Sequence, residues 1–339
     1  EAKVLDAHHI QVGETTYEGS YLILATGSSP FVPPIPGSKL EHVLTSDQIL
    51  TLTEIPSSLV VIGGGVIGIE FASFFSMIGT KVTVIEMMSE ILPMMDAEFA
   101  KLMRRELKGV DFHLGCKVEE ITAEEVRYTD AKGEKQAVPA SLVLMSVGRK
   151  PNTQGLEQLG LDIDRRGVVV NDRMQTNLST VYAIGDVNGR SLLAHSASRM
   201  AEVAVANIFG NKQMRMRYHA IPWAVYGNPE SAGAGMTESE AEKLGIPVRS
   251  QTVQMRANGR FLAEHGKKAA GLVKVICHRD TQTIVGIHLL GPYSSEMIWG
   301  ASALIEAELR VQDVKEIVFP HPSVSELIKD ACFALDHTL

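Results

Sequence analysis

The segment Leu59–Glu86, LVVIGGGVIGIEFASFFSMIGTKVTVIE, decides the fold of this chain. It predicts a buried strand, a glycine turn, a helix, and a second strand that ends in an acid. Gly63, Gly65 and Gly68 form the G-x-G-x-x-G pattern of a dinucleotide site. The first glycine permits a tight turn, the second lets the backbone approach a pyrophosphate, and the third lets the helix pack against the strand. The pyrophosphate would bind at the helix N-terminus, where free N–H groups point outward.

Glu86 ends the second strand in the position of the acid that binds the adenosine ribose hydroxyls. A carboxylate there repels a 2′-phosphate and no Arg follows closely, so the sequence favours NAD over NADP. Two other structures fit the same pattern: a flavin half-site of the same shape, and a transmembrane span. The span is disfavoured because glycines interrupt the apolar run and because Glu70 and Lys81 lie inside it.

The composition is that of a globular protein with a sizeable core. The 339 residues suggest two or three domains, with 45% hydrophobic and 21% charged residues. The formal net charge of −8 argues against nucleic acid or an anionic membrane as a partner. Cys116, Cys277 and Cys332 fit neither a metal-binding spacing nor a disulfide framework. We therefore expect no metal and a reducing compartment, cytoplasmic or, in a eukaryote, the mitochondrial matrix.

A weak internal repeat indicates two related nucleotide-binding domains. Tyr21–Pro30, YLILATGSSP, and Leu142–Pro151, LVLMSVGRKP, both run from an apolar strand into a glycine turn and a proline. Each follows an alternating polar and apolar stretch that is typical of a small β excursion, at Lys3–Thr16 and Cys116–Val138.

The repeat also bears on the start of the chain. The glycine fingerprint at Gly63 lies far upstream of the second closing turn at Gly148. A similar distance upstream of Gly27 falls before residue 1. We therefore expect an N-terminally truncated chain whose first nucleotide site is incomplete. The alternative is that residues 1–30 form a decorated hairpin.

The remaining sequence predicts three regions. Residues 1–51 and 149–217 look like parts of one discontinuous domain, and residues 52–148 form a compact βαβ domain with a helix at Asp96–Lys108. Asn211–Arg217 is a predicted linker. Residues 218–339 predict an α+β domain, with strands at Gly271–His278 and Thr283–Leu290, a helix at Ser294–Glu308 and a closing helix from about Ser323.

Val181–Asp186 predicts a buried strand that ends in Gly-Asp and is followed by Leu192–His195 and a helix through Ile208. An Asp at the carboxyl end of a parallel strand is well placed to accept hydrogen bonds from a ligand polyol. Asp186 would serve equally well as the cap of the next turn. A nucleotide site elsewhere in the chain favours the ligand role.

Pro320–Glu326, PHPSVSE, carries a candidate general base. His321 lies between two prolines that restrict its backbone, and rigid presentation suits a base that must hold its position. Glu326 could accept a hydrogen bond from the second ring nitrogen and fix the tautomer. Because Ser323–Glu326 also fits a capping box, Glu326 has a competing structural explanation.

Taken together, these motifs resemble those of the flavoprotein disulfide reductases (pyridine nucleotide-disulfide oxidoreductases), and most closely the dihydrolipoamide dehydrogenase branch. The matching motifs, ATG at 25–27, GGGVIGIE at 63–70, VGRKPN at 147–152, IGDV at 184–187 and HPSVSE at 321–326, span essentially the whole chain. The resemblance implies an α/β fold with Rossmann-like FAD/NAD(P)-binding domains and a C-terminal α+β dimerisation domain. The implied domains are a partial FAD-binding domain (1–51 and 149–217), an NAD-binding domain (52–148) and a dimerisation domain (218–339). The resemblance also implies that FAD and NAD are the cofactors and that the protein is a homodimer.

The resemblance also implies roles for individual residues. His321 would be the catalytic base, reaching into the partner subunit's site, with Glu326 orienting it. Glu70 would pair with a Lys beside a redox disulfide. The residues implied to contact FAD are Thr26, Gly27, Asp186, Leu192, Leu193, Ala194 and His195, and those implied to contact NAD are Gly63, Gly65, Gly68, Glu70, Glu86, Val118 and Gly148.

One departure from the family is large. Neither the flavin fingerprint nor the Cys-x4-Cys redox pair of the family occurs in these residues. We therefore expect the chain as given to lack dithiol chemistry, and we assign its function to a parent enzyme. That function is FAD-dependent oxidation of protein-bound dihydrolipoamide to lipoamide with reduction of NAD to NADH. The expected partner is the lipoyl domain of a 2-oxo-acid dehydrogenase or glycine cleavage complex.

Three alternatives to this function stay open. The parent could be another NAD(P)H-dependent disulfide reductase or an NADH oxidase-type flavoprotein, since the cysteine that distinguishes them would lie upstream. The chain could also be a catalytically inactive NAD-binding dimerisation fragment.

Overall fold

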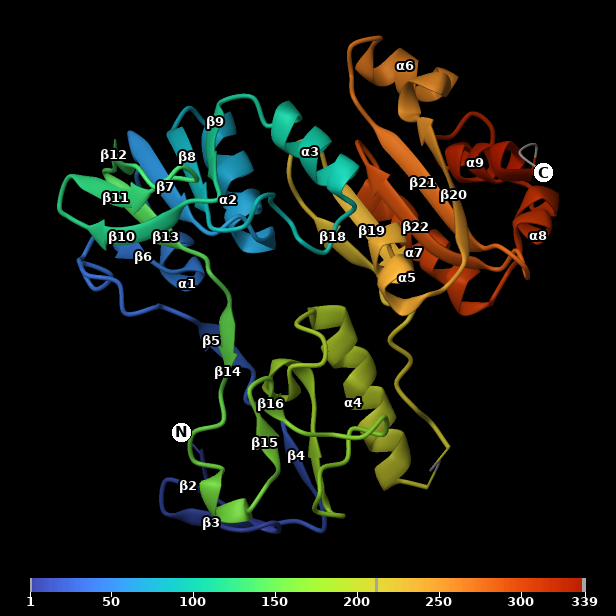
Figure 1. Ribbon diagram of the computed structural model, residues 1–339. Helices are drawn as coiled ribbons and strands as arrows, with labels where there is room; N and C mark the ends of the chain where they lie inside the picture. The colour runs from blue at the N-terminus through green and yellow to red at the C-terminus, as the bar shows by residue number, and fades with distance from the viewer. Residues whose placement is uncertain (1, 211–212, 337–339) are drawn as a thin grey trace. The chain divides into compact units, whose positions relative to one another are not determined.

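The computed structural model describes residues 2–210 and 213–336 (Figure 1). The chain divides into two compact units, which are described separately: Glu1–Phe31 with Gly148–Tyr218, and Val32–Val147 with His219–Leu339. The predicted linker Asn211–Arg217 begins outside the described residues, and residues 213–217 form neither helix nor strand. The boundaries of the three predicted domains stay predictions.

The second unit contains a parallel sheet built around the glycine-rich segment. Its strand order is β6-β13-β7-β8-β9, and every neighbouring pair is parallel. The predicted strand–turn–helix–strand arrangement is therefore confirmed. The elements are β6 (Val43–Leu44), α1 (Ser46–Ile49), β7 (Ser58–Ile62), α2 (Val66–Met77), β8 (Lys81–Glu86), α3 (Ala97–Glu106), β9 (Val110–Leu114) and β13 (Leu142–Met145).

Strand β7 is covered on both faces, which explains its continuous apolar sequence. Because successive side chains of a strand point to opposite faces, Leu59 and Val61 pack in one cluster with Phe75 of α2. Val60 packs on the other face in a cluster with Val126. Val126 belongs to an antiparallel sheet of β10 (Lys117–Ile121), β11 (Glu125–Thr129) and β12 (Lys135–Pro139).

The rest of the second unit is an antiparallel sheet covered by helices, as the sequence predicts. Its strand order is β18-β19-β22-β21-β20, and α7 and α9 pack against it. The elements are β18 (Trp223–Val225), β19 (Ser231–Gly235), α5 (Glu238–Leu244), β20 (Val248–Gln254), a 3-10 turn (Met255–Ala257), α6 (Gly259–His265), β21 (Leu272–His278), β22 (Ile284–Leu290), α7 (Ser294–Glu306), α8 (Val311–Glu316) and α9 (Glu326–Asp336).

The two sheets of the second unit share a hydrophobic core. Ile69 of α2 and Phe99 and Met103 of α3 pack in one cluster with Val225 of β18 and Leu290 of β22. All five side chains are fully buried. Burial of apolar surface on this scale holds the parallel and antiparallel sheets together as one body.

The first unit is assembled from two separate stretches of sequence. Strand β4 pairs with β17 in parallel, and β5 pairs with β14 antiparallel. The elements are β1 (Ala2–Val4), β2 (His9–Val12), β3 (Thr15–Glu18), β4 (Leu22–Leu24), β5 (Ser28–Pro30), β14 (Arg149–Pro151), a 3-10 turn (Glu157–Leu159), β15 (Ile163–Asp164), β16 (Gly167–Val168), β17 (Val181–Ala183), a second 3-10 turn (Gly185–Asn188) and α4 (Ala194–Ile208).

The predicted internal repeat is confirmed at the level of elements. A three-stranded antiparallel excursion precedes β4, and another precedes β13. A glycine with positive φ follows each of these strands, Gly27 at +70° and Gly148 at +119°. Such angles strain any residue with a side chain, which explains why both copies have glycine there.

Candidate functional site

The three glycines of the turn differ in what a side chain would meet. A Cβ on Gly63 would lie 2.5 Å from the Ser146 carbonyl oxygen, and one on Gly68 would lie 2.1 Å from the Gly63 carbonyl oxygen. Both positions therefore exclude a side chain, as predicted. A Cβ on Gly65 would meet no heavy atom within 4 Å. Gly65 is also the N-cap of α2, so no N-cap side chain accepts a hydrogen bond from the first N–H groups of the helix.

Glu86 contacts this turn directly. Its Oε2 accepts a hydrogen bond from the Gly64 N–H at 2.5 Å, and its Oε1 accepts one from the Met88 N–H at 2.6 Å. The strand-end acid and the glycine turn predicted from the sequence thus lie together. The two hydrogen bonds from the backbone to the carboxylate were not predicted, because the sequence pattern gives only the position of the acid.

The other three residues predicted to contact NAD lie elsewhere. The Glu70 Oε1 accepts a hydrogen bond from the Tyr226 N–H at 2.9 Å, and burial raises the pKa of this carboxyl. The Val118 side chain packs in the core of its sheet. Gly148 belongs to the first unit. A role of Glu70, Val118 or Gly148 toward NAD stays a prediction.

The residues predicted to contact FAD belong to the first unit. The Thr26 Oγ1 donates to the Asn152 carbonyl at 2.6 Å, and the Asn152 N–H donates to the Gly27 carbonyl at 2.9 Å. These contacts tie the two glycine turns of the repeat together. Leu192, Ala194 and His195 are exposed around the start of α4, and Leu193 is its half-buried N-cap.

Asp186 lies in a network that the sequence does not reveal. Its Oδ2 accepts a hydrogen bond from the Ser28 hydroxyl at 2.6 Å. Arg149 donates to the same hydroxyl at 2.7 Å and to the Ser28 carbonyl at 2.8 Å, and its Nε lies 3.8 Å from the carboxylate. The Asp186 side chain is thus held by a serine and an arginine that come from opposite copies of the repeat.

His321 and Glu326 contact each other as predicted. The Nδ1 of His321 lies 3.0 Å from the Glu326 Oε1, while the Glu326 Oε2 accepts a hydrogen bond from the Ser323 N–H at 2.9 Å. The Glu326 carboxylate therefore contacts both the imidazole and the turn that precedes α9, while the Ser323 hydroxyl pairs with that of Ser325. The hydrogen bonds to the carboxylate, from Ser323 first and His321 second, lower the pKa of Glu326. A role of Glu326 in orienting a catalytic His321 stays a prediction.

The exposed ring of His321 is available to a reactant. Its side chain is 82% exposed. Helix α9 begins at Glu326 and not at the predicted Ser323, because residues 323–325 form the turn that the Glu326 carboxylate caps.

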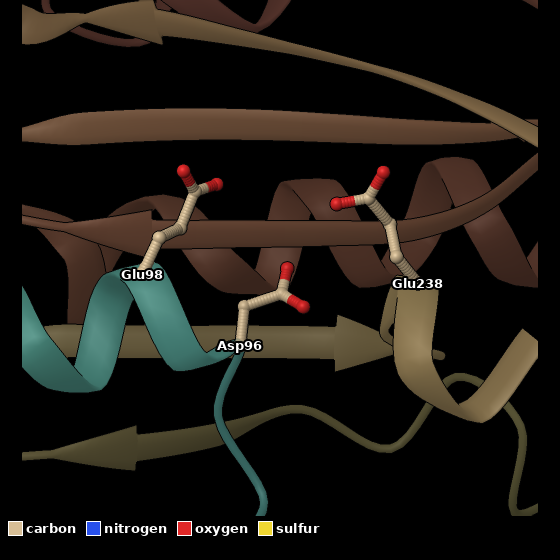
Figure 2. A group of neighbouring side chains, drawn as sticks. All are labelled: Asp96, Glu98 and Glu238. Atoms are coloured by element: carbon tan, nitrogen blue, oxygen red, sulfur yellow. The ribbon is translucent and has the colours of Figure 1, made fainter.

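A cluster of three acids was missed in the sequence. The carboxylates of Asp96, Glu98 and Glu238 converge from the start of α3 and the start of α5 (Figure 2). Lys274 Nζ contacts all three, at 3.1 Å from Asp96 and 2.7 Å from Glu238, and also pairs with Glu98. The amine therefore occupies the position that a metal ion would take.

Lys274 is nearly completely buried, with a side chain 5% exposed. Burial alone would lower the pKa of its ammonium, but the hydrogen bonds to Glu238 and Glu98 and the charge of Asp96 outweigh it and raise the pKa. Lys274 therefore stays charged. The signal in the sequence is a single Lys inside the apolar strand LVKVICH, because a charge buried in a strand needs paired acids.

The cross-strand neighbour of Lys274 on β22 is His288, which is buried. Its Nε2 lies 3.1 Å from the Met236 carbonyl, and its Nδ1 has no hydrogen-bond partner among the described residues. Burial lowers the pKa of His288. The charges of Asp96 and Glu240 oppose this shift, and the charge of Lys274 adds to it.

We expect this histidine to make stability depend on pH. The unfolded chain binds a proton at His288 as the pH falls through about 6.5, whereas the folded chain resists it, so stability declines on acidification. His288→Gln, which keeps a donor for the Met236 carbonyl, should reduce this decline. Urea unfolding at neutral and mildly acidic pH measures it, with His8→Gln at an exposed site as control. Equal pH dependence in wild type and His288→Gln would contradict the assignment.

Comparison with known proteins places these features in a family. Residues 1–201 match the family model described as pyridine nucleotide-disulphide oxidoreductase, and residues 221–332 match the dimerisation domain of that family. This chain belongs to the pyridine nucleotide-disulphide oxidoreductases. The family assignment and the α/β fold predicted from the sequence are confirmed. FAD and a pyridine nucleotide are the cofactors of this family.

Relatives within the family include several dihydrolipoyl dehydrogenases. The mitochondrial enzyme of Pisum sativum is 38% identical over 96% of this chain and 66% of its own length. The dihydrolipoyl dehydrogenase of Mycoplasma pneumoniae is 34% identical over 98% of this chain and 74% of its own length. A leghemoglobin reductase of Glycine max is 37% identical over 94% of this chain and 62% of its own length. The chain spans about two thirds of the length of such relatives.

A solved structure of the family has the same fold. The Cu(II) complex of the HOCl-induced flavoprotein disulfide reductase RclA from Escherichia coli superposes with a TM-score of 0.87 at 30% identity. The match covers 99% of this chain and 78% of RclA.

The residues of this oxidoreductase fit both cofactors. The open space at Gly65 and the uncapped N-terminus of α2 suit a pyrophosphate. In the first unit, a Cβ on Gly27 would likewise meet no heavy atom within 4 Å, and Leu192 is exposed. No helix among the described residues is both long enough and apolar enough to cross a membrane.

Proposed function

We propose that this chain provides the NAD-binding, flavin-contacting and base-carrying parts of a dihydrolipoamide dehydrogenase. The observation that carries the proposal is the pairing of His321 with Glu326, which leaves the second ring nitrogen of an exposed imidazole available. The dihydrolipoyl dehydrogenase relatives at 34–38% identity support the substrate class.

The proposed role of His321 is that of a base toward a dihydrolipoyl thiol. With its Nδ1 proton held by Glu326, the neutral ring accepts a proton at Nε2. Deprotonation matters because the thiolate, and not the thiol, attacks a disulfide. FAD and NAD, when bound, supply the electron-transfer chemistry that follows. Asp186, Thr26 and the Leu192–His195 segment would hold FAD.

The glycine turn would hold NAD rather than NADP. The N–H groups at the start of α2 would bind the pyrophosphate, and Glu86 would accept hydrogen bonds from the adenosine ribose. A 2′-phosphate at that position would lie against the Glu86 carboxylate and be repelled. The proposed assembly is a homodimer in which His321 serves the partner subunit, with a lipoyl domain as the protein substrate, in a reducing compartment.

The test of the function is a comparison of substrates with the full-length protein. We expect NAD-linked oxidation of dihydrolipoamide to be faster than NADPH-linked reduction of glutathione disulfide and faster than NADH oxidation by oxygen. A visible spectrum checks for bound flavin. Preference for either of the other two reactions would replace this proposal with the corresponding reductase or oxidase.

The NAD site can be tested separately by Gly65→Asp. Asp is a favourable N-cap, so the stability of the fold should be unchanged or higher. NAD binding should weaken by at least about tenfold, because the new carboxylate faces the pyrophosphate. Calorimetric titration with NAD measures this. Gly259→Asp, which adds the same charge at the start of α6, is the matched control. Unchanged NAD affinity in Gly65→Asp would exclude this turn as the pyrophosphate site.

A further inference from the structure

A cleft of about 570 Å³ in the second unit shares no residue with the glycine turn or with His321. One of its sides is α3, including Lys101 and Arg105, and the other is formed by residues 254–256 and 268–272. The cleft thus lies between the helix that follows the NAD-binding strand β8 and the edge of the antiparallel sheet. Its volume is within the usual range of sites for small molecules.

The cleft is basic although the whole chain is acidic. Its lining includes the five cations Lys101, Arg104, Arg105, Arg256 and Lys268, against the two carboxylates Glu98 and Glu106, in a chain of net charge −8. Both carboxylates already have partners, since Glu98 pairs with Lys274 and Glu106 with Arg105. An anion in this cleft would therefore meet an excess of positive charge.

Three of the cations form no close ion pair among the described residues, although the charge of Lys101 helps to lower the pKa of Glu90. Arg104 is held by Glu90 through two hydrogen bonds, at 2.8 and 3.0 Å. Lys101, Arg256 and Lys268, by contrast, have no salt-bridge partner among residues 2–210 and 213–336. They come from both sides of the cleft, so both of its walls carry positive charge.

We propose that this cleft binds a small molecule that carries two or more phosphate groups. Guanidinium groups on both sides, Arg105 and Arg256, offer the planar donor pairs that suit phosphate oxygens. Leu102, Ala269 and Leu272 add an apolar surface for the organic part of the ligand. The volume of about 570 Å³ is that of a small-molecule site, which favours a small molecule over an acidic segment of a partner protein.

The probe for this site is inorganic tripolyphosphate, titrated calorimetrically into the full-length protein with NAD present in excess. The double variant Lys101→Gln/Arg256→Gln should bind it at least about tenfold more weakly, because charge-assisted hydrogen bonds are the strong ones. Lys132→Gln/Lys243→Gln removes two exposed cations outside the cleft and should leave the affinity unchanged. Wild-type affinity should also fall as salt is added.

Three results would overturn the proposal: no saturable binding of tripolyphosphate, equal loss in both double variants, or unchanged binding in Lys101→Gln/Arg256→Gln. A polyglutamate peptide is titrated in parallel. If the peptide binds through Lys101 and Arg256 while tripolyphosphate does not, the cleft is a protein-docking site and the proposal is wrong. None of these outcomes depends on the dehydrogenase activity.

Discussion

Replacing Lys274 with methionine is expected to destabilise the second unit by roughly 3–5 kcal/mol, the usual effect of leaving a buried charge without its partner. The change removes one ammonium and leaves the carboxylates of Asp96, Glu98 and Glu238 facing one another. Asp96 is itself buried, so in a poorly solvated position its carboxylate would lose the only cationic partner that it has among the described residues. Urea unfolding followed by linear extrapolation measures the loss.

The controls separate charge from packing. Lys243→Met makes the same change at an exposed site and should shift the free energy of unfolding by less than about 0.5 kcal/mol. Adding Asp96→Asn and Glu238→Gln to Lys274→Met removes the repulsion and should recover much of the lost stability. If Lys274→Met unfolds at the same urea concentration as wild type, the three carboxylates do not depend on this amine.

The stability of Lys274→Met should also depend on pH in a characteristic way. Without the ammonium, the clustered carboxylates should have pKa values above those in the unfolded chain. Groups of this kind destabilise the fold at neutral pH, and the penalty disappears as the pH falls and they become protonated. The deficit of Lys274→Met relative to wild type should therefore shrink on acidification, which a simple cavity would not cause.

In the full-length protein, His321→Gln is expected to slow dihydrolipoamide oxidation by about 10²–10⁴-fold, the range typical for loss of a general base. Gln has no group that can accept the thiol proton. Electron transfer from NADH to a dye does not need this proton transfer, so it should remain close to the wild-type rate. Steady-state assays of both reactions on one preparation make the comparison.

Glu326→Gln is a second variant for the same assays and is expected to have a smaller effect than His321→Gln. The amide has the same shape but only one acceptor oxygen, so it can serve either the His321 Nδ1 or the Ser323 N–H but not both. Dihydrolipoamide oxidation should therefore fall, but less than in His321→Gln, because the imidazole is still present. Because Glu326 also accepts the Ser323 N–H, thermal unfolding of the variant shows whether the turn before α9 is weakened. Equal losses of both activities in His321→Gln would contradict the assignment of His321 as a base.

The sequence predicts best where the constraint is local. The clash of a Cβ on Gly68 with the Gly63 carbonyl arises within one turn, so the glycine spacing alone predicts the turn. The pairing of His321 with Glu326 was predicted for the same reason, since the two residues are only five positions apart in the chain.

Contacts between distant segments were not predicted. Arg149 and Ser28 hold Asp186 from separate copies of the repeat, and no periodicity links them. Lys274 meets acids that lie far from it in sequence, on α3 and α5. The basic cleft was not predicted because its two sides, α3 and the region of residues 254–272, are far apart in the sequence. Such features depend on tertiary packing, which a single sequence does not specify position by position.

The hydrogen bond from the Gly64 N–H to Glu86 would affect how a dinucleotide binds at the proposed site. The Glu86 carboxylate accepts one backbone N–H on each oxygen, and each oxygen keeps a second acceptor site for a ribose hydroxyl. Binding of the ribose would replace water at those sites, so its net gain would be the difference between two similar hydrogen bonds. The affinity for NAD would then come mainly from the pyrophosphate. The main effect of Glu86 would be to disfavour NADP, because its carboxylate repels the 2′-phosphate. The hydrogen bonds that Glu86 accepts from the Gly64 and Met88 amides hold the glycine turn in shape without a bound ligand.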